Sequence, residues 1–305
     1  MSSSTIGAFD LHDETPLSEG ESKQSWAIFG AFALLTTIAY GNMLSYTAVH
    51  WSKGLYSHGW LVPLFAGYLL WVRRRPFVEV ESKERWIGVG MIAAALSLRL
   101  YASYYDYNNF ERLSFLVVLL GCCVLVGGWW MVRWAGPAVG FLAFMFPLPW
   151  FLENSLLLWL QNKATAASTI VFQLMGLTAV REGNVIYLDD AAEPLTVAEA
   201  CSGLRMLTIF GAMCVAVALL SERPWWDRLA VLVAAVPIAV ASNIIRIVVT
   251  GLLYTYVPGA NEAGLAHKMV HDFAGFGMMF IGMGLLAVLM AVLRVATVPE
   301  DDDVD

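Results

Sequence analysis

The chain has 305 residues, of which 59% are hydrophobic and 14% are charged; its mean hydropathy is +0.65 and its formal net charge is −7 at pH 7. This composition excludes an ordinary soluble domain and predicts an integral membrane protein. No nucleic-acid partner is predicted.

Acidic residues collect at the two ends of the chain, and we expect residues 1–25 and 294–305 to be solvated cytoplasmic tails without fixed structure. The membrane domain is expected to occupy residues 26–293. The first 25 residues lack the basic and apolar regions of a secretory signal, so the first apolar segment is expected to be retained. The four cysteines show no paired spacing, and no disulfide framework, metal or cofactor is predicted.

Eight apolar segments are predicted to span the membrane, because a span needs about 20 apolar residues. In chain order they are residues 26–46, 60–72, 87–104, 113–132, 134–152, 204–220, 229–254 and 271–293. The second is short and needs residues 56–59 to cross. The predicted fold class is therefore an all-α polytopic membrane protein.

Lys and Arg in the short loops predict how these spans are oriented. These basic residues follow the even-numbered spans. Residues 73–75, 83 and 85 follow span two, residue 133 follows span four, residues 223 and 228 follow span six, and residue 294 follows span eight. That side is predicted to be cytoplasmic, and both termini lie on it. The loops at residues 47–57, 105–112 and 257–268 are then extracytoplasmic.

The segment between spans five and six is harder to interpret. Residues 156–175 are apolar enough for a ninth span, but a crossing there would move Arg223, Arg228 and Arg294 outside. The charge pattern instead favours an amphipathic helix that lies on the outer face or dips into it. Residues 185–188 and 195–197 are short β-compatible runs, and they predict a small extracytoplasmic hairpin that caps the bundle.

A thiol within a polar cluster opens span six. Cys201 is surrounded by Glu199, Ser202 and Gly203, whereas Cys122, Cys123 and Cys214 lie within apolar spans and are interpreted as small apolar residues. With the predicted orientation, Cys201 lies at the outer start of its span. Arg246 lies in the outer half of span seven, and His271 lies at the outer start of span eight.

These three side chains form a coherent chemical set. A thiolate is the attacking species, nearby cations favour it, and an imidazole within hydrogen-bond reach can take its proton. Arg246, with Asn243 one turn away on the same helix face, could stabilise an oxyanion or favour the thiolate. Glu199 and Asp272 are candidate orienters of His271 or Arg246. Whether His271 or Arg246 takes the thiol proton stays open.

Four sequence blocks resemble those of the exosortase/archaeosortase family. Residues 199–205 (EACSGLR), 243–247 (NIIRI) and 271–275 (HDFAG) resemble its three signature blocks, and residues 56–63 (YSHGWLVP) resemble its N-terminal segment. The similarity runs over about residues 26–293. Archaeal relatives often carry arginine where this chain has His271, so the histidine indicates the bacterial branch. His58, in the N-terminal block, either hydrogen-bonds within the bundle or lines the substrate entrance.

The resemblance implies a protease or transpeptidase at the outer face of a bacterial inner membrane, associated with exopolysaccharide. Its substrates would be exported proteins whose C-terminal tails carry a short PEP-like motif, a membrane helix and a basic end. Cys201 would form an acyl thioester, and Arg246 and His271 would complete the catalytic set. Analogy with soluble sortases implies transfer to an unidentified acceptor. The implied partners are these C-terminal tails, the membrane lipid and that acceptor.

Two other functions stay open. His267 and His271 stand at i, i+4 and could ligate a metal in an intramembrane metalloenzyme, although Lys268 replaces the glutamate of the HExxH motif. An anion- or proton-coupled transporter could use Arg246 and His271. Broken helices near the midplane and repeated halves would favour this function; the sequence shows no internal repeat, and its polar set is expected at the outer edge of the membrane.

Overall fold

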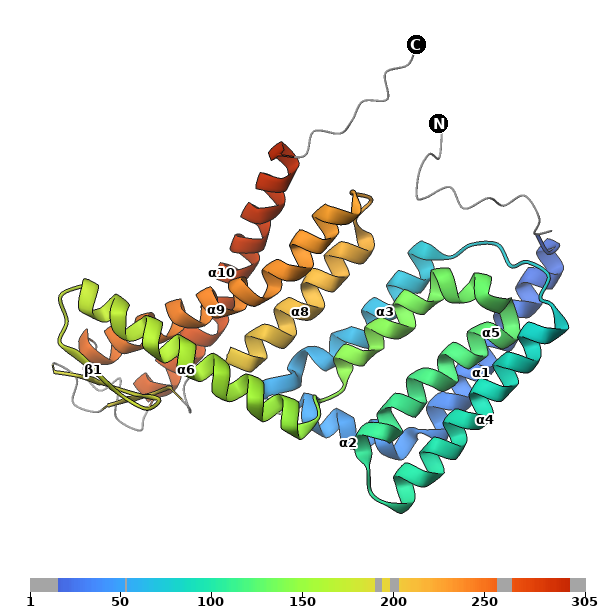
Figure 1. Cartoon of the computed structure of the whole chain (residues 1–305), viewed down its shortest axis with the longest axis horizontal. Helices are drawn as coiled ribbons and strands as arrows, with labels where there is room; N and C mark the ends of the chain where they lie inside the picture. The colour runs from blue at the N-terminus through green and yellow to red at the C-terminus, as the bar shows by residue number, and fades with distance from the viewer. Residues whose placement is uncertain (1–15, 53, 190–193, 198–202, 257–264, 297–305) are drawn as a thin grey trace, which may run out of the picture. The chain divides into compact units, whose positions relative to one another are not determined.

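The computed structural model describes residues 16–52, 54–189, 194–197, 203–256 and 265–296, drawn as ribbons in Figure 1. Side chains of residues 54, 55, 203 and 265–276 lie outside this description. The chain divides into two compact units, Met1–Pro147 (unit 1) and Leu148–Asp305 (unit 2).

Unit 1 is built from helices. They are α1 (Glu19–Ala39), α2 (Gly41–Trp51), the 3-10 helix η1 (Gly54–Trp60), α3 (Leu61–Arg73), α4 (Ser82–Tyr104), α5 (Asn108–Phe141) and the 3-10 helix η2 (Leu142–Met145). Helix α1 begins with a capping box, in which the Ser18 hydroxyl accepts from the Glu21 N–H and the Glu21 carboxylate accepts from the Ser18 N–H. Helix α1 therefore begins at Glu19, seven residues before the start of the predicted membrane domain at residue 26.

The first predicted span is broken. Helices α1 and α2 meet at Tyr40 with a bend of 73°. The Tyr40 side chain is fully buried there, and its hydroxyl shares a 2.9 Å hydrogen bond with Ser114 of α5. The hydrogen bond of the buried Tyr40 hydroxyl to α5 holds the chain at this bend. The bend was not predicted, because residues 26–46 are apolar on both sides of it.

Helix α5 reverses direction at Gly127 and Gly128. Both have non-helical dihedral angles, and Gly128 has a φ of +62°, which is readily adopted only by glycine. In a straight helix, Arg112 and Pro147 would lie about 50 Å apart at a rise of 1.5 Å per residue. Instead, the Arg112 guanidinium donates to the Pro147 carbonyl at 3.2 Å. The predicted boundary between spans four and five, near Arg133, lies a few residues after the actual turn.

Close backbone approach joins α4 to the first leg of α5. A Cβ on Gly88 would lie 2.6 Å from the Leu125 amide nitrogen, and a Cβ on Gly121 would lie 2.8 Å from Ile92. Small residues at a helix crossing permit this distance, as is common in membrane proteins. At the loop joining these helices, exposed aromatic rings pack on one another, as is typical of a membrane–water interface; they are Tyr101, Tyr104, Tyr105, Tyr107 and Phe110.

Unit 2 combines helices with one small sheet. Its elements are α6 (Trp150–Leu174), β1 (Ala179–Glu182), β2 (Val185–Leu188), β3 (Leu195–Thr196), α8 (Gly203–Leu220), α9 (Trp225–Tyr256) and α10 (Leu265–Ala296). The antiparallel sheet has the order β1-β2-β3, with Ala179 opposite Leu188 and Val185 opposite Thr196. The two strands predicted from the sequence therefore pair, and β1 is an additional strand.

Two apolar clusters hold unit 2 together. One joins α6 and the sheet to α9, with Phe172, Ile186 and Ile247 fully buried at its centre. The other joins α8, α9 and α10 around Phe210 and Met278. Both clusters include α9, which is therefore the central helix of unit 2.

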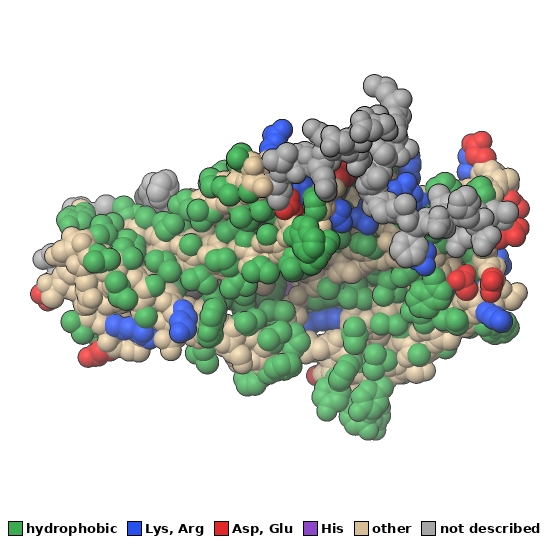
Figure 2. All heavy atoms as spheres, turned by 45° about the horizontal axis from the view of Figure 1, so that its top comes forward, with side chains coloured by type: hydrophobic (Ala, Val, Ile, Leu, Met, Phe, Trp, Pro, Cys, Tyr) green, Lys and Arg blue, Asp and Glu red, His purple; other side chains and the backbone are tan. Residues whose placement is uncertain are grey.

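Many large apolar side chains lie on the surface of the described helices. Figure 2 shows hydrophobic side chains over most of the described surface in view, and many large ones, including Leu34, Trp86 and Val233, are exposed. By length and composition, four described helices can cross a membrane, or five if the bent pair α1 and α2 forms one span. The protein is an all-α membrane protein apart from its small sheet, but the predicted eight spans are not confirmed.

Helix α6 buries several of its polar side chains within unit 2. Gln161, Thr165, Ser168 and Thr169 are buried in the protein, while apolar side chains such as Leu158 and Ile170 are exposed. A helix lying on the outer face would turn these polar residues to water. The sequence showed that α6 has a polar face and an apolar face. Packing against α9 decided that polar side chains are buried in the protein and apolar ones are exposed.

Candidate functional site

The candidate site is built around a polar face on α9. Ser242, Asn243, Arg246 and Thr250 recur at helical spacing, and each is at least 96% buried. Pro237 lies earlier in the same helix. A guanidinium at this depth is costly in a membrane and is usually functional or paired.

A second arginine lies near the first. Arg205, in the first turn of α8, is close enough to Arg246 for the two positive charges to act on each other. Helices α8 and α9 are joined by a short connection and pack side by side, so the start of α8 lies beside the later part of α9 (Figure 1). Two cations in one partly buried region favour an anion or a developing negative charge between them.

Several buried polar atoms on this face have no hydrogen-bond partner within the described residues. They are the Ser242 hydroxyl, both amide atoms of Asn243 and Nε of Arg246. An unmade hydrogen bond at a buried group costs about 1–3 kcal/mol, and more at a charged one. Such a concentration of unmade bonds is expected where a substrate or a reacting group is to be bound.

Helix α6 forms a further wall. Its Phe172 ring packs where a Cβ on Gly251 of α9 would lie, so the C-terminal ends of the two helices are adjacent. Ser168 lies one turn before Phe172 and one turn after Ala164 on the face that packs against α9. Its hydroxyl is fully buried, and it also lacks a partner among the described residues.

The predicted thiol region lies next to this site in the chain but outside the described residues. Glu199, Cys201 and Ser202 fall in that gap, and Gly203 is the first residue of α8. His267, His271 and Asp272 belong to α10, so the two histidines are one helical turn apart, but their side chains are not described. Of the predicted set, the structure therefore brings Asn243 and Arg246 together.

A contact between α8 and α10 relates the remaining positions. The Phe210 ring occupies the place of a Cβ on Gly282. Toward the N-terminus of each helix, Gly203 lies about 10 Å from Phe210 along α8, and His271 lies about 16 Å from Gly282 along α10, at a rise of about 1.5 Å per residue. Met206 and Met278, each one turn nearer the start of its helix, belong to the same buried cluster, which also includes residues of α9.

His58 lies in unit 1, where one ring nitrogen, Nε2, is 3.2 Å from the carbonyl oxygen of Phe144. Near it, the Trp51 indole donates to the Met145 carbonyl at 2.7 Å. These bonds tie η1 and α2 to η2. They support the interpretation of His58 as a residue that hydrogen-bonds within the bundle, and a role at the substrate entrance stays a prediction.

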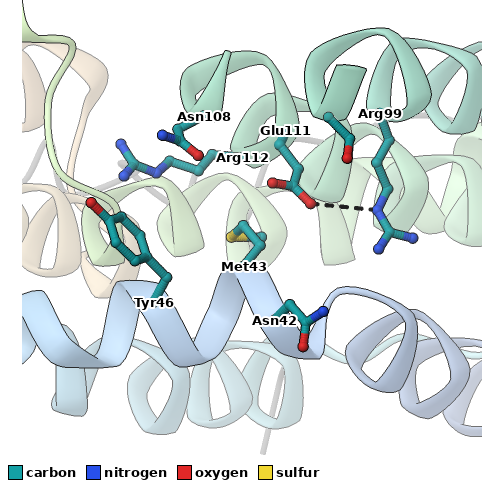
Figure 3. Close-up of a pocket in the computed structure, with 8 residues that line it drawn as sticks. Asn42, Met43, Tyr46, Arg99, Asn108, Glu111 and Arg112 are labelled. Atoms are coloured by element: carbon teal, nitrogen blue, oxygen red, sulfur yellow. Dashed lines mark ion pairs between the residues drawn. The ribbon is translucent and has the colours of Figure 1, made fainter. Parts of the chain in front are cut away.

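Unit 1 also contains a polar cavity of about 250 Å³. Figure 3 shows Glu111 and Arg99 pointing toward each other across it, and their ion pair measures 3.5 Å. Arg112 donates to Asn109 and to the Pro147 carbonyl. Because these charged groups bind protein partners, the cavity is best explained as a polar connection between α4 and α5.

Sequence reasoning did not single out three residues of the candidate site. Ser168 and Ser242 are short hydroxyl residues in apolar helices, and such residues commonly bond their own helix backbone. Arg205 ends the sequence block of residues 199–205, but no role was predicted for it. The available signal was the recurrence of polar residues at helical spacing in residues 161–169 and 242–250.

These features define a polytopic α-helical membrane protein with a buried, arginine-containing polar site in its second half. The profile of a family described as transmembrane exosortase matches residues 50–288, more than three quarters of the chain, and the chain belongs to this family. No curated protein and no solved structure matches it. Family membership implies a membrane protease or transpeptidase that acts on exported proteins.

Proposed function

We propose that the chain is a cysteine transpeptidase of a bacterial inner membrane, with Cys201 as the nucleophile and Arg246 and His271 as its catalytic partners. The observation that carries this proposal is the nearness of two cations, the buried Arg246 and the half-buried Arg205. Arg246 acts electrostatically on Arg205, which lies four residues after Cys201 in the sequence.

The chemistry follows from these groups. The Cys201 thiolate attacks the scissile carbonyl carbon and forms a C–S bond, while the carbonyl oxygen becomes an oxyanion facing Arg246. Collapse of this intermediate breaks the C–N bond, and the leaving amine takes a proton from the His271 imidazolium. The nucleophile of an acceptor then attacks the acyl thioester and gives its proton to the neutral His271, and cleavage of the C–S bond releases the Cys201 thiolate.

The substrate is an exported protein with a C-terminal sorting signal that comprises a PEP-like motif, an apolar helix and a basic end. Such a tail reaches the site from the lipid. The Lys and Arg pattern supports both termini in the cytoplasm and the site at the extracytoplasmic face. A meeting of Cys201 and His271 is supported by the Phe210–Gly282 contact, because both residues lie on the N-terminal side of it in their own segments.

The experiment compares two cysteine substitutions during co-expression with a tagged exported protein that carries such a tail. Cys201→Ala is expected to abolish processing, whereas Cys214→Ala, which removes a buried sulfur from the α8 to α10 cluster, is expected to retain it. Immunoblots of the membrane fraction check that both variants accumulate. Undiminished processing by Cys201→Ala would end the proposal.

A further inference from the structure

Ser168 of α6 and Ser242 and Asn243 of α9 are buried hydrogen-bonding side chains that the proposed chemistry does not use. Asn243 is 1% exposed and the two serines are fully buried. Within the described residues, neither serine hydroxyl has a hydrogen-bond partner, and neither do the oxygen and nitrogen of the Asn243 amide. The group comes from two helices, α6 and α9, that pack on each other.

The same helix provides a contrast. Thr165 is as deeply buried as Ser168 and lies three residues before it on α6, but its hydroxyl donates to the Gln161 carbonyl at 2.6 Å. Thr169 likewise donates to the Thr165 carbonyl at 2.9 Å. Ser168 thus differs from its neighbours because its hydroxyl has not been satisfied by its own helix.

The chemistry of the group indicates what it binds. A carboxamide offers one acceptor and two donors in a plane, which matches the carbonyl and N–H of a peptide group, and a serine hydroxyl can both donate and accept. A polypeptide that is unwound inside a membrane must find such partners for its own peptide groups. A bond that is to be cleaved needs that unwound form, since a helix shields its carbonyl carbons.

We propose that Ser168, Ser242 and Asn243 bind the main chain of the substrate in extended form and hold it against Arg246. This inference rests on the proposed function and adds its mode of recognition. Recognition through the main chain places few demands on side chains.

The inference makes an unusual prediction, because removing these groups is expected to stabilise the free protein. Replacing an unpartnered buried polar group by an apolar one of similar shape relieves its desolvation cost. Ser168→Ala and Asn243→Leu should therefore unfold at the same temperature as the wild type or a higher one. Both should bind substrate more weakly.

The test uses full-length protein in detergent with Cys201→Ala as the background, so that binding is measured without turnover. The probe is a fluorescent synthetic peptide with a Pro-Glu-Pro segment, an apolar helix of about 20 residues and a basic end. Ser168→Ala should weaken its binding about fivefold to tenfold and Asn243→Leu at least tenfold, as expected for one and two lost hydrogen bonds. Thr165→Val, the control on the same helix, should change binding less than twofold.

A second probe tests the main chain directly. N-methylation of the peptide bonds that precede the apolar helix should weaken binding to the parent protein, and Ser168→Ala should add little to that loss. A fall in the unfolding temperature of both Ser168→Ala and Asn243→Leu would overturn the inference, and so would equal effects of Ser168→Ala and Thr165→Val. Because binding is measured without the thiol, these results do not depend on whether Cys201→Ala abolishes processing.

Discussion

Substitution of Gly282 in α10 tests the packing of α10 against α8. A Cβ on Gly282 would overlap the ring of Phe210 in α8, and that ring is 1% exposed and cannot swing away. Gly284, two residues later on the same helix, has no atom within 4 Å of the place where its Cβ would lie. Gly282→Ala and Gly284→Ala therefore form a matched pair.

The expected magnitude follows from two effects. Alanine in place of glycine within a helix gains up to about 1 kcal/mol in helix propensity, and this gain is common to both variants. Inserting a methyl group into a filled core costs about 1–3 kcal/mol, and this cost falls on Gly282→Ala alone. The two variants should therefore differ by about 1–3 kcal/mol in the free energy of unfolding.

Thermal unfolding in detergent measures this difference, with both variants heated at the same rate because membrane proteins often unfold irreversibly. At about 2–4 °C per kcal/mol, Gly282→Ala should unfold roughly 2–12 °C below Gly284→Ala. Processing of a tagged substrate should fall in Gly282→Ala and persist in Gly284→Ala. Equal unfolding temperatures would refute the contact between α8 and α10, and with it the alignment of the start of α8 with His271.

Three further predictions concern other parts of the chain. Gly88→Ala should destabilise unit 1 by about 1–3 kcal/mol relative to Gly90→Ala in the same melting assay, because its Cβ would lie 2.6 Å from the Leu125 backbone, whereas that of Gly90 would meet nothing within 4 Å. Equal stability would contradict the close approach of α4 and α5. Arg246→Lys should reduce the rate of processing about 10²-fold to 10³-fold with little change in unfolding temperature, because lysine keeps the charge but loses the planar donors; a rate near that of the wild type would remove Arg246 from the mechanism. A green fluorescent protein fused to the C-terminus should fluoresce and an alkaline phosphatase fused there should be inactive, because the Lys and Arg pattern predicts a cytoplasmic C-terminus; the reverse result would invert the proposed orientation.

The existence and length of most helices could be predicted from the sequence. The limits of α4 and α9 lie within a few residues of the predicted spans at residues 87–104 and 229–254. A long apolar run in a membrane must form a helix, because only a helix satisfies all of its own peptide groups there. The strands at Val185–Leu188 and Leu195–Thr196 were also predictable, because short β-compatible runs alternate with polar turns.

The candidate site was predictable only in part. Asn243 and Arg246 were selected because polar residues are costly in an apolar helix, and the structure places both on one buried face. Ser168 was not selected, because a serine in a helix is usually satisfied by its own backbone. Only its packing against α9 showed that it is buried without such a bond.

The sequence by itself determined the class of protein and the helical segments, since these depend on composition and on local apolar periodicity. The tertiary structure decided the bend at Tyr40, the reversal of α5 at Gly127 and the inward direction of the polar face of α6. In a soluble protein, apolar faces turn inward and can be predicted from the pattern alone. In lipid, apolar side chains are stable on either side of a helix, so the contacts between helices decide which face is covered.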